Sequence, residues 1–156
     1  MSGEGFLGEV EVIDYLRKVK KLEIYIPMKD IGIDFVAKGK HFYEIQVKTS
    51  VFQKHSYFWF DLHKQKMVYS RNTYYILVCK SIARRNFMGK SHNFIVIPSI
   101  HIKRWIENGS IIGKRNNENV FNLFVYPKFE EKTWIYKNKG RVIDLTRYWN
   151  NFKNIR

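Results

Sequence analysis

The chain has 156 residues, and its 28 lysines and arginines outnumber its 14 aspartates and glutamates to give a net charge of +14. This length, with 45% hydrophobic residues, suffices for one buried core, which excludes whole-chain disorder and predicts a single domain over residues 1–156. No run of about 18 apolar residues is present, so an integral membrane protein is excluded. The single cysteine, Cys79, excludes an internal disulfide framework, and without a signal-peptide pattern we expect a cytoplasmic protein.

An amphipathic helix is expected over about residues 4–18, because apolar residues recur there at helical spacing. Short strands with alternating or continuous apolar residues then follow at 22–26, 33–37, 42–49 and 57–60. The turn residues 38–40 join the second and third of these strands into a hairpin.

The second half of the sequence mixes strands and helices. Strands are predicted at 74–79, 94–97, 120–126 and 133–136, a short helix at 63–70, and a polar loop at 113–119. Ser99 is expected to cap a helix that continues to about residue 108, and Asp144 to cap a final helix with Leu145, Tyr148, Trp149 and Phe152 on one face. The order of elements predicts one mixed α/β domain.

The positive charge makes nucleic acid the first candidate partner, because lysine and arginine that neutralise phosphates release condensed counterions. An anionic membrane surface is less favoured, since the basic residues are spread along the chain instead of lying on one amphipathic helix. The alternative is a solvated surface of the usual kind. The basic clusters are Lys18-Lys20-Lys21, Lys38-Lys40, Lys64-Lys66, Arg84-Arg85, Lys103-Arg104 and Lys114-Arg115.

Polar residues alternate with apolar ones along the second strand of the hairpin. Glu44, Gln46 and Lys48 therefore share one face of that strand, while the other face points to a core. Asp34 joins their face if the hairpin pairs it with Glu44 or with Gln46. The simplest explanation is the solvent-facing side of an antiparallel sheet.

The order of short motifs in the first third of the chain resembles the PD-(D/E)XK nuclease superfamily in its Q-x-K variant. The motifs are Gly8-Glu9, Pro27, Gly32-Ile33-Asp34 and Ile45-Gln46-Val47-Lys48-Thr49-Ser50. Within the superfamily the chain is most similar to archaeal Holliday-junction resolvases, Mrr-like endonucleases and related uncharacterised nuclease-like domains. The resemblance implies a restriction-endonuclease-like core, in which helices flank a mixed central β-sheet.

The resemblance also implies a magnesium- or manganese-dependent endonuclease that hydrolyses phosphodiester bonds in DNA. Its metal would be held by Asp34, the Gln46 amide oxygen and the Val47 carbonyl, with Glu9 bound directly or through water. Lys48 would orient water and balance phosphate charge. Glu9, Asp34, Gln46 and Lys48 are thus the expected catalytic residues, and similarity to resolvases implies a homodimer.

The chain departs from the usual pattern at Gln46, where most members of the superfamily have a carboxylate. The uncharged amide should weaken metal binding, and Glu44 could replace it only if the metal moved along the strand. Glu4 and Glu11 are alternative helix carboxylates. Two other readings stay open: a catalytically weak or inactive nucleic-acid-binding module on the same fold, and an interaction subunit that binds protein or RNA through exposed aromatic residues.

Overall fold

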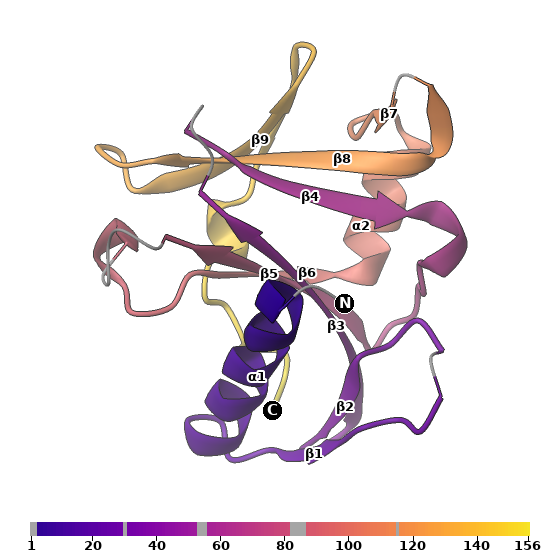
Figure 1. Cartoon of the computed structure of the whole chain (residues 1–156), viewed down its shortest axis with the longest axis vertical. Coiled ribbons are helices and arrows are strands. Elements are labelled where there is room, and N and C mark those ends of the chain that lie inside the picture. The colour runs from indigo at the N-terminus through magenta and orange to yellow at the C-terminus, as the bar shows by residue number, and fades with distance from the viewer. Residues whose placement is uncertain (1–2, 30, 53–55, 82–86, 115) are drawn as a thin grey trace.

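The computed structural model describes residues 3–29, 31–52, 56–81, 87–114 and 116–156, and two five-stranded sheets dominate it (Figure 1). In the first sheet β3 and β5 are parallel and all other neighbours are antiparallel. Its strands, in spatial order, are β1 (Glu23–Tyr25), β2 (Phe35–Lys38), β3 (Phe42–Val51), β5 (Thr73–Lys80) and β6 (Phe94–Pro98).

The second sheet is wholly antiparallel and lies above the first in the view of Figure 1. Its strands are β10 (Arg141–Asp144), β9 (Thr133–Asn138), β8 (Asn117–Lys128) and β4 (Phe58–His63), with β7 (Gly113–Lys114) paired to β8. The helices are α1 (Gly3–Lys18) and α2 (Ser99–Glu107), and single 3-10 turns form at Lys64–Lys66, Phe87–Gly89 and Thr146–Tyr148.

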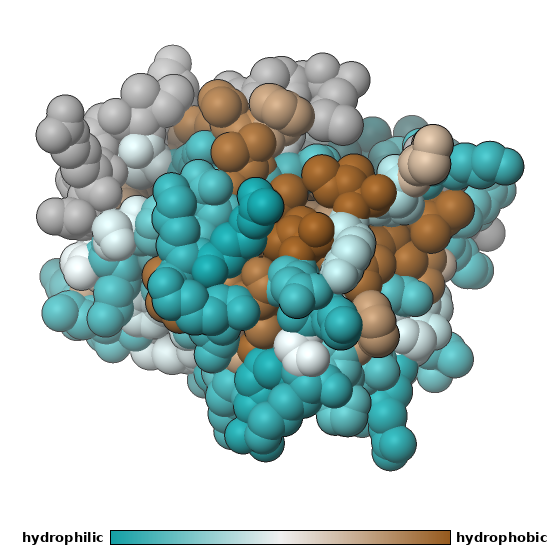
Figure 2. All heavy atoms as spheres, turned by 90° about the horizontal axis from the view of Figure 1, so that it is seen from below, coloured by the Kyte–Doolittle hydropathy of each residue, from teal (hydrophilic) through white to brown (hydrophobic). Residues whose placement is uncertain are grey.

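Strands β5 and β6 of the first sheet are buried on both faces, and each face has its own core. Strand β1 at the other edge is largely exposed, and apolar surface is visible between hydrophilic side chains when the molecule is seen from below (Figure 2). Val12 and Leu16 of α1 pack with Ile45 and Val47 of β3 on one face. On the other face the inner side chains of the second sheet pack against those of β5 and β6, and Cys79 lies in this core. Alternation along each strand therefore decides which of the two cores a residue joins.

The mixed α/β class is confirmed, but the expectation that helices flank the sheet is wrong for one face. The crossover from β3 to the parallel strand β5 carries β4, and the second sheet, not a helix, covers most of the face opposite α1. The local pattern explains this: Phe58, Phe60 and Leu62 are buried while Trp59 and Asp61 between them are exposed. A period of two buries one face of a strand and does not suit a helix.

The final helix predicted from Asp144 is also wrong, because only the turn Thr146–Tyr148 is helical. Asn150 ends it with φ +50° and pairs with β6: its N–H donates to the Phe94 carbonyl, and its Oδ1 accepts from the Phe94 N–H. The buried side chains of this segment join different cores, Tyr148 between the sheets and Phe152 under α1. Hydrogen bonding of the β6 edge thus outweighs the apolar pattern of a helix.

Ser99 does not cap α2, because the helix begins at Ser99 itself and Pro98 precedes it. The Ser99 hydroxyl instead donates to the Ser70 carbonyl at 2.9 Å and accepts from the Ser70 N–H at 3.0 Å. It fixes the loop before β5 against the start of α2.

The first helix and the strands expected from the sequence are present, with ends shifted by a few residues. The residues expected to form a helix at 63–70 make one 3-10 turn, and the expected polar loop at 113–119 contains β7 and the start of β8. The basic residues Arg84, Arg85 and Arg115 lie outside the described residues. No helix in the described part of the chain is long and apolar enough to cross a membrane.

Candidate active site

Asp34 lies directly before β2, where the hairpin strands separate. Its N–H donates to the Ile45 carbonyl at 2.9 Å, and its Oδ2 accepts from the Val47 N–H at 2.6 Å. Continuing the register that pairs Phe35 with Ile45 places Asp34 beside Gln46, one of the two arrangements that the sequence allows. In an extended strand the N–H and C=O of one residue point to the same edge, so the Val47 carbonyl also faces the gap before β2.

Glu9 reaches Asp34 from α1, and its carboxyl group is hydrogen-bonded to that of Asp34. Gly8 allows this approach, because a Cβ on Gly8 would lie 1.8 Å from Thr49 Oγ1 on β3. The helix therefore contacts the strand through backbone at this point. Glycine at position 8 is explained by close packing of α1 on β3.

The Glu9 carboxyl has a pKa raised to about 7. Partial burial is the largest cause, and the negative charge of Asp34 and the hydrogen bond to it add to the effect. Two carboxyl groups in contact cannot both ionise without cost, so Glu9 keeps its proton to a higher pH than an isolated glutamate does. A bound dication would remove that cost by neutralising both.

The side chains of Gln46 and Lys48 project from the face of β3 that is opposite α1. Parallel pairing sets Gln46 beside Tyr75 and Lys48 beside Leu77, and both partners belong to the core between the sheets. Both polar side chains are half-buried, so the solvent-facing explanation of their alternation is wrong. Gln46 Oε1 is buried and finds no hydrogen-bond partner among the described residues, and in the same part of the chain Lys48 forms no ion pair.

The segment after β4 forms a wall beside these groups. Gly32, two residues before Asp34, has φ +79°, and a Cβ there would lie 3.0 Å from the Lys66 carbonyl oxygen. The Tyr75 hydroxyl accepts from the Val68 N–H at 3.0 Å and fixes the same segment to β5. The backbone of Lys66, an exposed residue of this turn, therefore lies against Gly32, two residues before Asp34. The sequence shows Lys64 and Lys66 as basic, but only the Gly32 contact connects their turn with the site.

The alternative carboxylates have other partners. Glu11 forms ion pairs with Lys80 at 3.0 Å and with His92 at 2.8 Å, away from Asp34. Glu44 accepts a hydrogen bond from the Thr73 hydroxyl at 2.9 Å. The side chain of Glu4 lies outside the described residues.

The donor set fits a hard divalent cation. Within the described residues no group of three histidine, cysteine, aspartate or glutamate side chains could hold a metal ion. Glu9 and Asp34 supply two carboxylates, however, and Gln46 adds an amide oxygen with no other partner. A buried oxygen without a hydrogen bond costs about 1–3 kcal/mol, which a metal ligand bond would recover. Magnesium takes such oxygen ligands and completes its shell with water.

The Glu9→Gln variant is expected to be more stable than the wild type at pH 8 in EDTA, by about 1 kcal/mol or about 2–4 °C in Tm. A folded-state pKa of about 7, above the unfolded value, means that wild-type stability falls as pH rises from about 4.5 to 7. The difference in stability between the variant and the wild type should disappear by pH 5. Thermal melts at both pH values measure this difference. As a control, Glu11→Gln removes the contacts of Glu11 with Lys80 and His92 and should destabilise the protein at pH 8.

Equal melting of Glu9→Gln and wild type at both pH values would contradict the contact between Glu9 and Asp34.

Comparison of the chain with protein-family models, with curated proteins and with solved structures gives no significant match.

Proposed function

We propose that the protein is a magnesium- or manganese-dependent endonuclease that hydrolyses phosphodiester bonds in DNA, on a restriction-endonuclease-like core. The observation that carries the proposal is the contact between the carboxyl groups of Glu9 and Asp34 where the hairpin strands separate. The Gln46 amide oxygen, which is buried and has no hydrogen-bond partner among the described residues, is a further candidate ligand. The net charge of +14 supports a polyanionic substrate. A homodimer stays a prediction.

Asp34, Glu9, the Gln46 amide oxygen and the Val47 carbonyl would hold the metal ion. When bound, the ion would lower the pKa of a water molecule and polarise the scissile phosphate. The Val47 N–H fixes the Asp34 carboxylate through its 2.6 Å hydrogen bond. Lys48 is free to contact a phosphate oxygen and orient the attacking water, because no described carboxylate neutralises it. Lys64 and Lys66 would hold the DNA backbone nearby.

Cleavage assays on linear, nicked and four-way-junction DNA test the proposal. With Mg²⁺ or Mn²⁺ we expect cleavage of at least one substrate, and none in EDTA. DNA binding without cleavage on every substrate would overturn the endonuclease and leave the binding module. A salt titration adds a check on binding, because the log of affinity should fall by roughly 0.9 for each neutralised phosphate per log unit of salt.

The Gln46→Glu variant should bind metal more tightly than the wild type. The change adds a charged ligand oxygen at unchanged side-chain length, so the Mn²⁺ concentration at half-saturation should fall about tenfold. In EDTA the same variant should be less stable, because a third negative charge would then join Glu9 and Asp34. Calorimetric Mn²⁺ titration and melts with and without Mn²⁺ measure both effects. Unchanged Mn²⁺ affinity would show that Gln46 is no ligand.

A second candidate function, a nucleic-acid-binding module, is favoured by the outer face of the second sheet. Trp59 is 43% exposed and is paired across strands with Phe124. The Tyr57 ring lies 5.5 Å from Phe124 and 5.4 Å from Tyr126, and Asp61 fixes the Trp59 indole by a 2.8 Å hydrogen bond.

Two lysines, Lys137 and Lys139, line a hollow of about 240 Å³ together with three of these rings. Rings flanked by lysines suit the stacking of unpaired bases.

Anisotropy with a single-stranded oligonucleotide tests this face. Trp59→Ala should weaken binding about tenfold, since stacking contributes about 1–3 kcal/mol per base, whereas Asp34→Asn should leave it unchanged. Equal affinity of Trp59→Ala and wild type would remove the face from nucleic-acid binding.

A further inference from the structure

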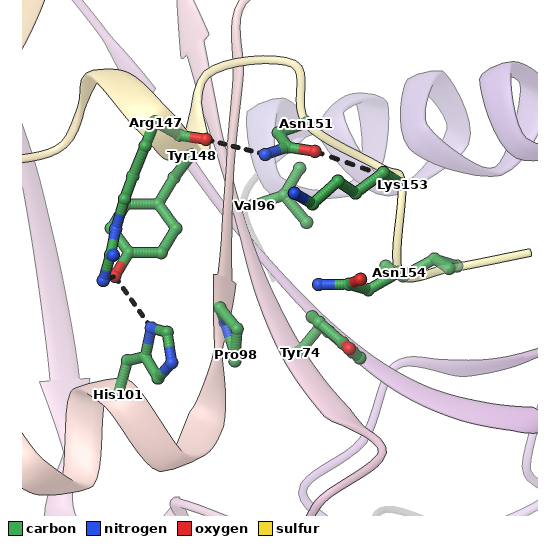
Figure 3. A pocket seen from close by; sticks show the side chains of 10 residues that line it. Tyr74, Val96, Pro98, His101, Arg147, Tyr148, Asn151, Lys153 and Asn154 are labelled. Carbon is green, nitrogen blue, oxygen red and sulfur yellow. Dashed lines mark hydrogen bonds between the residues drawn. The ribbon is translucent and has the colours of Figure 1, made fainter.

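A pocket of about 230 Å³ opens at the end of the first sheet, where β5 and β6 meet the C-terminal segment (Figure 3). Tyr74 and Pro98 are paired across these strands and form one side of it. The rest of the lining comes from Val96 of β6, from α2 and from residues 147–155. None of the lining residues belongs to the site around Asp34.

The lining of this pocket is cationic. Arg147, Lys153 and His101 face it together with the amides of Asn151 and Asn154, and no aspartate or glutamate lines it. Neither Arg147 nor Lys153 forms an ion pair with a carboxylate in the described part of the chain. Asp144 is close enough to Arg147 for their charges to interact, but it does not line the pocket. Positive charges gathered around one hollow attract an anion.

The buried Tyr148 holds two of these groups in place. Arg147 Nη2 donates to the Tyr148 hydroxyl, and the guanidinium carbon lies 4.7 Å from the centre of the tyrosine ring. The same hydroxyl lies 2.7 Å from His101 Nδ1. Because the oxygen accepts from Arg147, its proton is free for Nδ1, which leaves Nε2–H of the neutral imidazole as a donor to the pocket.

The electrostatics agree with an anion site. The pKa of His101 is lowered, first by burial and then by the positive charges of Arg147 and Arg104. An anion placed among these groups would offset that repulsion and raise the pKa again. Asn154 makes no hydrogen bond within the described residues and adds an amide donor, while Asn151 is used within the segment, where it donates to the Arg147 carbonyl at 2.8 Å.

We propose that this pocket binds a phosphate group. Arginine presents a planar pair of donors, and lysine and histidine add two more positions, which together suit an anion with several oxygens and up to two charges better than a single carboxylate. The volume admits the phosphate and part of its ester. The phosphate has two chemical sources, a free nucleotide or the 5′ end of a nucleic-acid strand. The proposal is independent of metal-dependent cleavage.

The test follows the His101 ring proton by NMR through a pH titration, at matched ionic strength in chloride. The probes are inorganic phosphate, a nucleoside 5′-monophosphate, and one oligonucleotide with and without a 5′-phosphate. We expect phosphate to raise the pKa of His101 and both Arg147→Gln and Lys153→Gln to weaken binding about tenfold. Lys128→Gln, an exposed residue of β8, is the matched control and should bind as wild type.

The probes also separate the sources. Tighter binding of the 5′-phosphorylated strand than of its unphosphorylated form supports a strand end, and preference for the mononucleotide supports a free nucleotide. The proposal is overturned if none of the probes changes the pKa of His101. It is also overturned if Lys153→Gln and Arg147→Gln both bind phosphate as tightly as the wild type. Because Arg147 packs on the buried Tyr148, its replacement also affects folding, and the exposed Lys153 supplies the variant without that effect.

Discussion

Asp34→Asn is expected to lower metal-dependent DNA cleavage by at least about 100-fold, since changes to groups that merely support metal ligands already cost about 10–100-fold. Asparagine keeps an oxygen that accepts the 2.6 Å hydrogen bond from the Val47 N–H, so the hairpin junction should be retained. What the variant loses is the negative charge. The measurement is the cleavage rate with Mg²⁺ or Mn²⁺, together with a Mn²⁺ titration.

Two further variants make this result specific. Lys48→Met should keep Mn²⁺ binding and lose turnover, because Lys48 is assigned to water and phosphate. Glu130→Gln removes an exposed carboxylate from the turn between β8 and β9 and should cleave as wild type. Equal cleavage by wild type and Asp34→Asn would mean a contaminating nuclease or a misplaced site.

Gly8→Ala is expected to destabilise the protein by about 1–3 kcal/mol and to impair the site as well. In an exposed helix the same change usually adds stability, by about 1 kcal/mol. Here the new Cβ would lie 1.8 Å from Thr49 Oγ1, so α1 must move away from β3 and carry Glu9 away from Asp34. Urea denaturation measures the first effect. The pH dependence of stability between pH 5 and 8 measures the second and should become flatter.

Thr49→Ala supplies the control for this clash. Removing Thr49 Oγ1 leaves the threonine Cβ position 3.0 Å from the new methyl group, a tight but tolerable contact. The double variant should therefore recover part of the lost stability. Thr49→Ala alone should change stability little, because that hydroxyl is buried with no hydrogen-bond partner among the described residues. If Gly8→Ala instead stabilises the protein, α1 does not pack on β3 through this glycine.

Much of the candidate site could be predicted because it depends on local patterns. Alternation along β3 fixes which side chains share a face, and the short turn at Gly39 limits the hairpin registers to those that keep opposed residues on one side. The spacing of residues along α1 does not by itself distinguish Glu9 from Glu11. The resemblance to the nuclease superfamily, which rests in part on Gly8-Glu9, favours Glu9. The structure brings Glu9 to Asp34 and turns Glu11 towards His92.

The elements that were missed depend on contacts between distant segments. The apolar residues of 145–152 have the spacing of a helix, but some are buried in one core and some in the other. The segment therefore passes along the edge of β6, where Trp149 bridges to Ile95, and the local sequence pattern contains no sign of this contact. The burial of Gln46 likewise results from the second sheet, whose strands come from both sides of β5 in the sequence. Alternating residues are expected on a wet face or on a covered one, and only the tertiary structure distinguishes the two.

The crossover through β4 also affects how the chain can fold. His63 pairs with Val120 and Phe58 with Val125, so β4 leaves the ribosome long before its partner β8 is made. Until β8 arrives, an alternating aromatic strand has both edges open, the condition under which strands pair with other chains. Pairing between such distant segments is slow, on a scale of about milliseconds to seconds. The second sheet therefore cannot be completed until β5 and β6 of the first sheet have also been made, so the two sheets are not consecutive folding units along the chain.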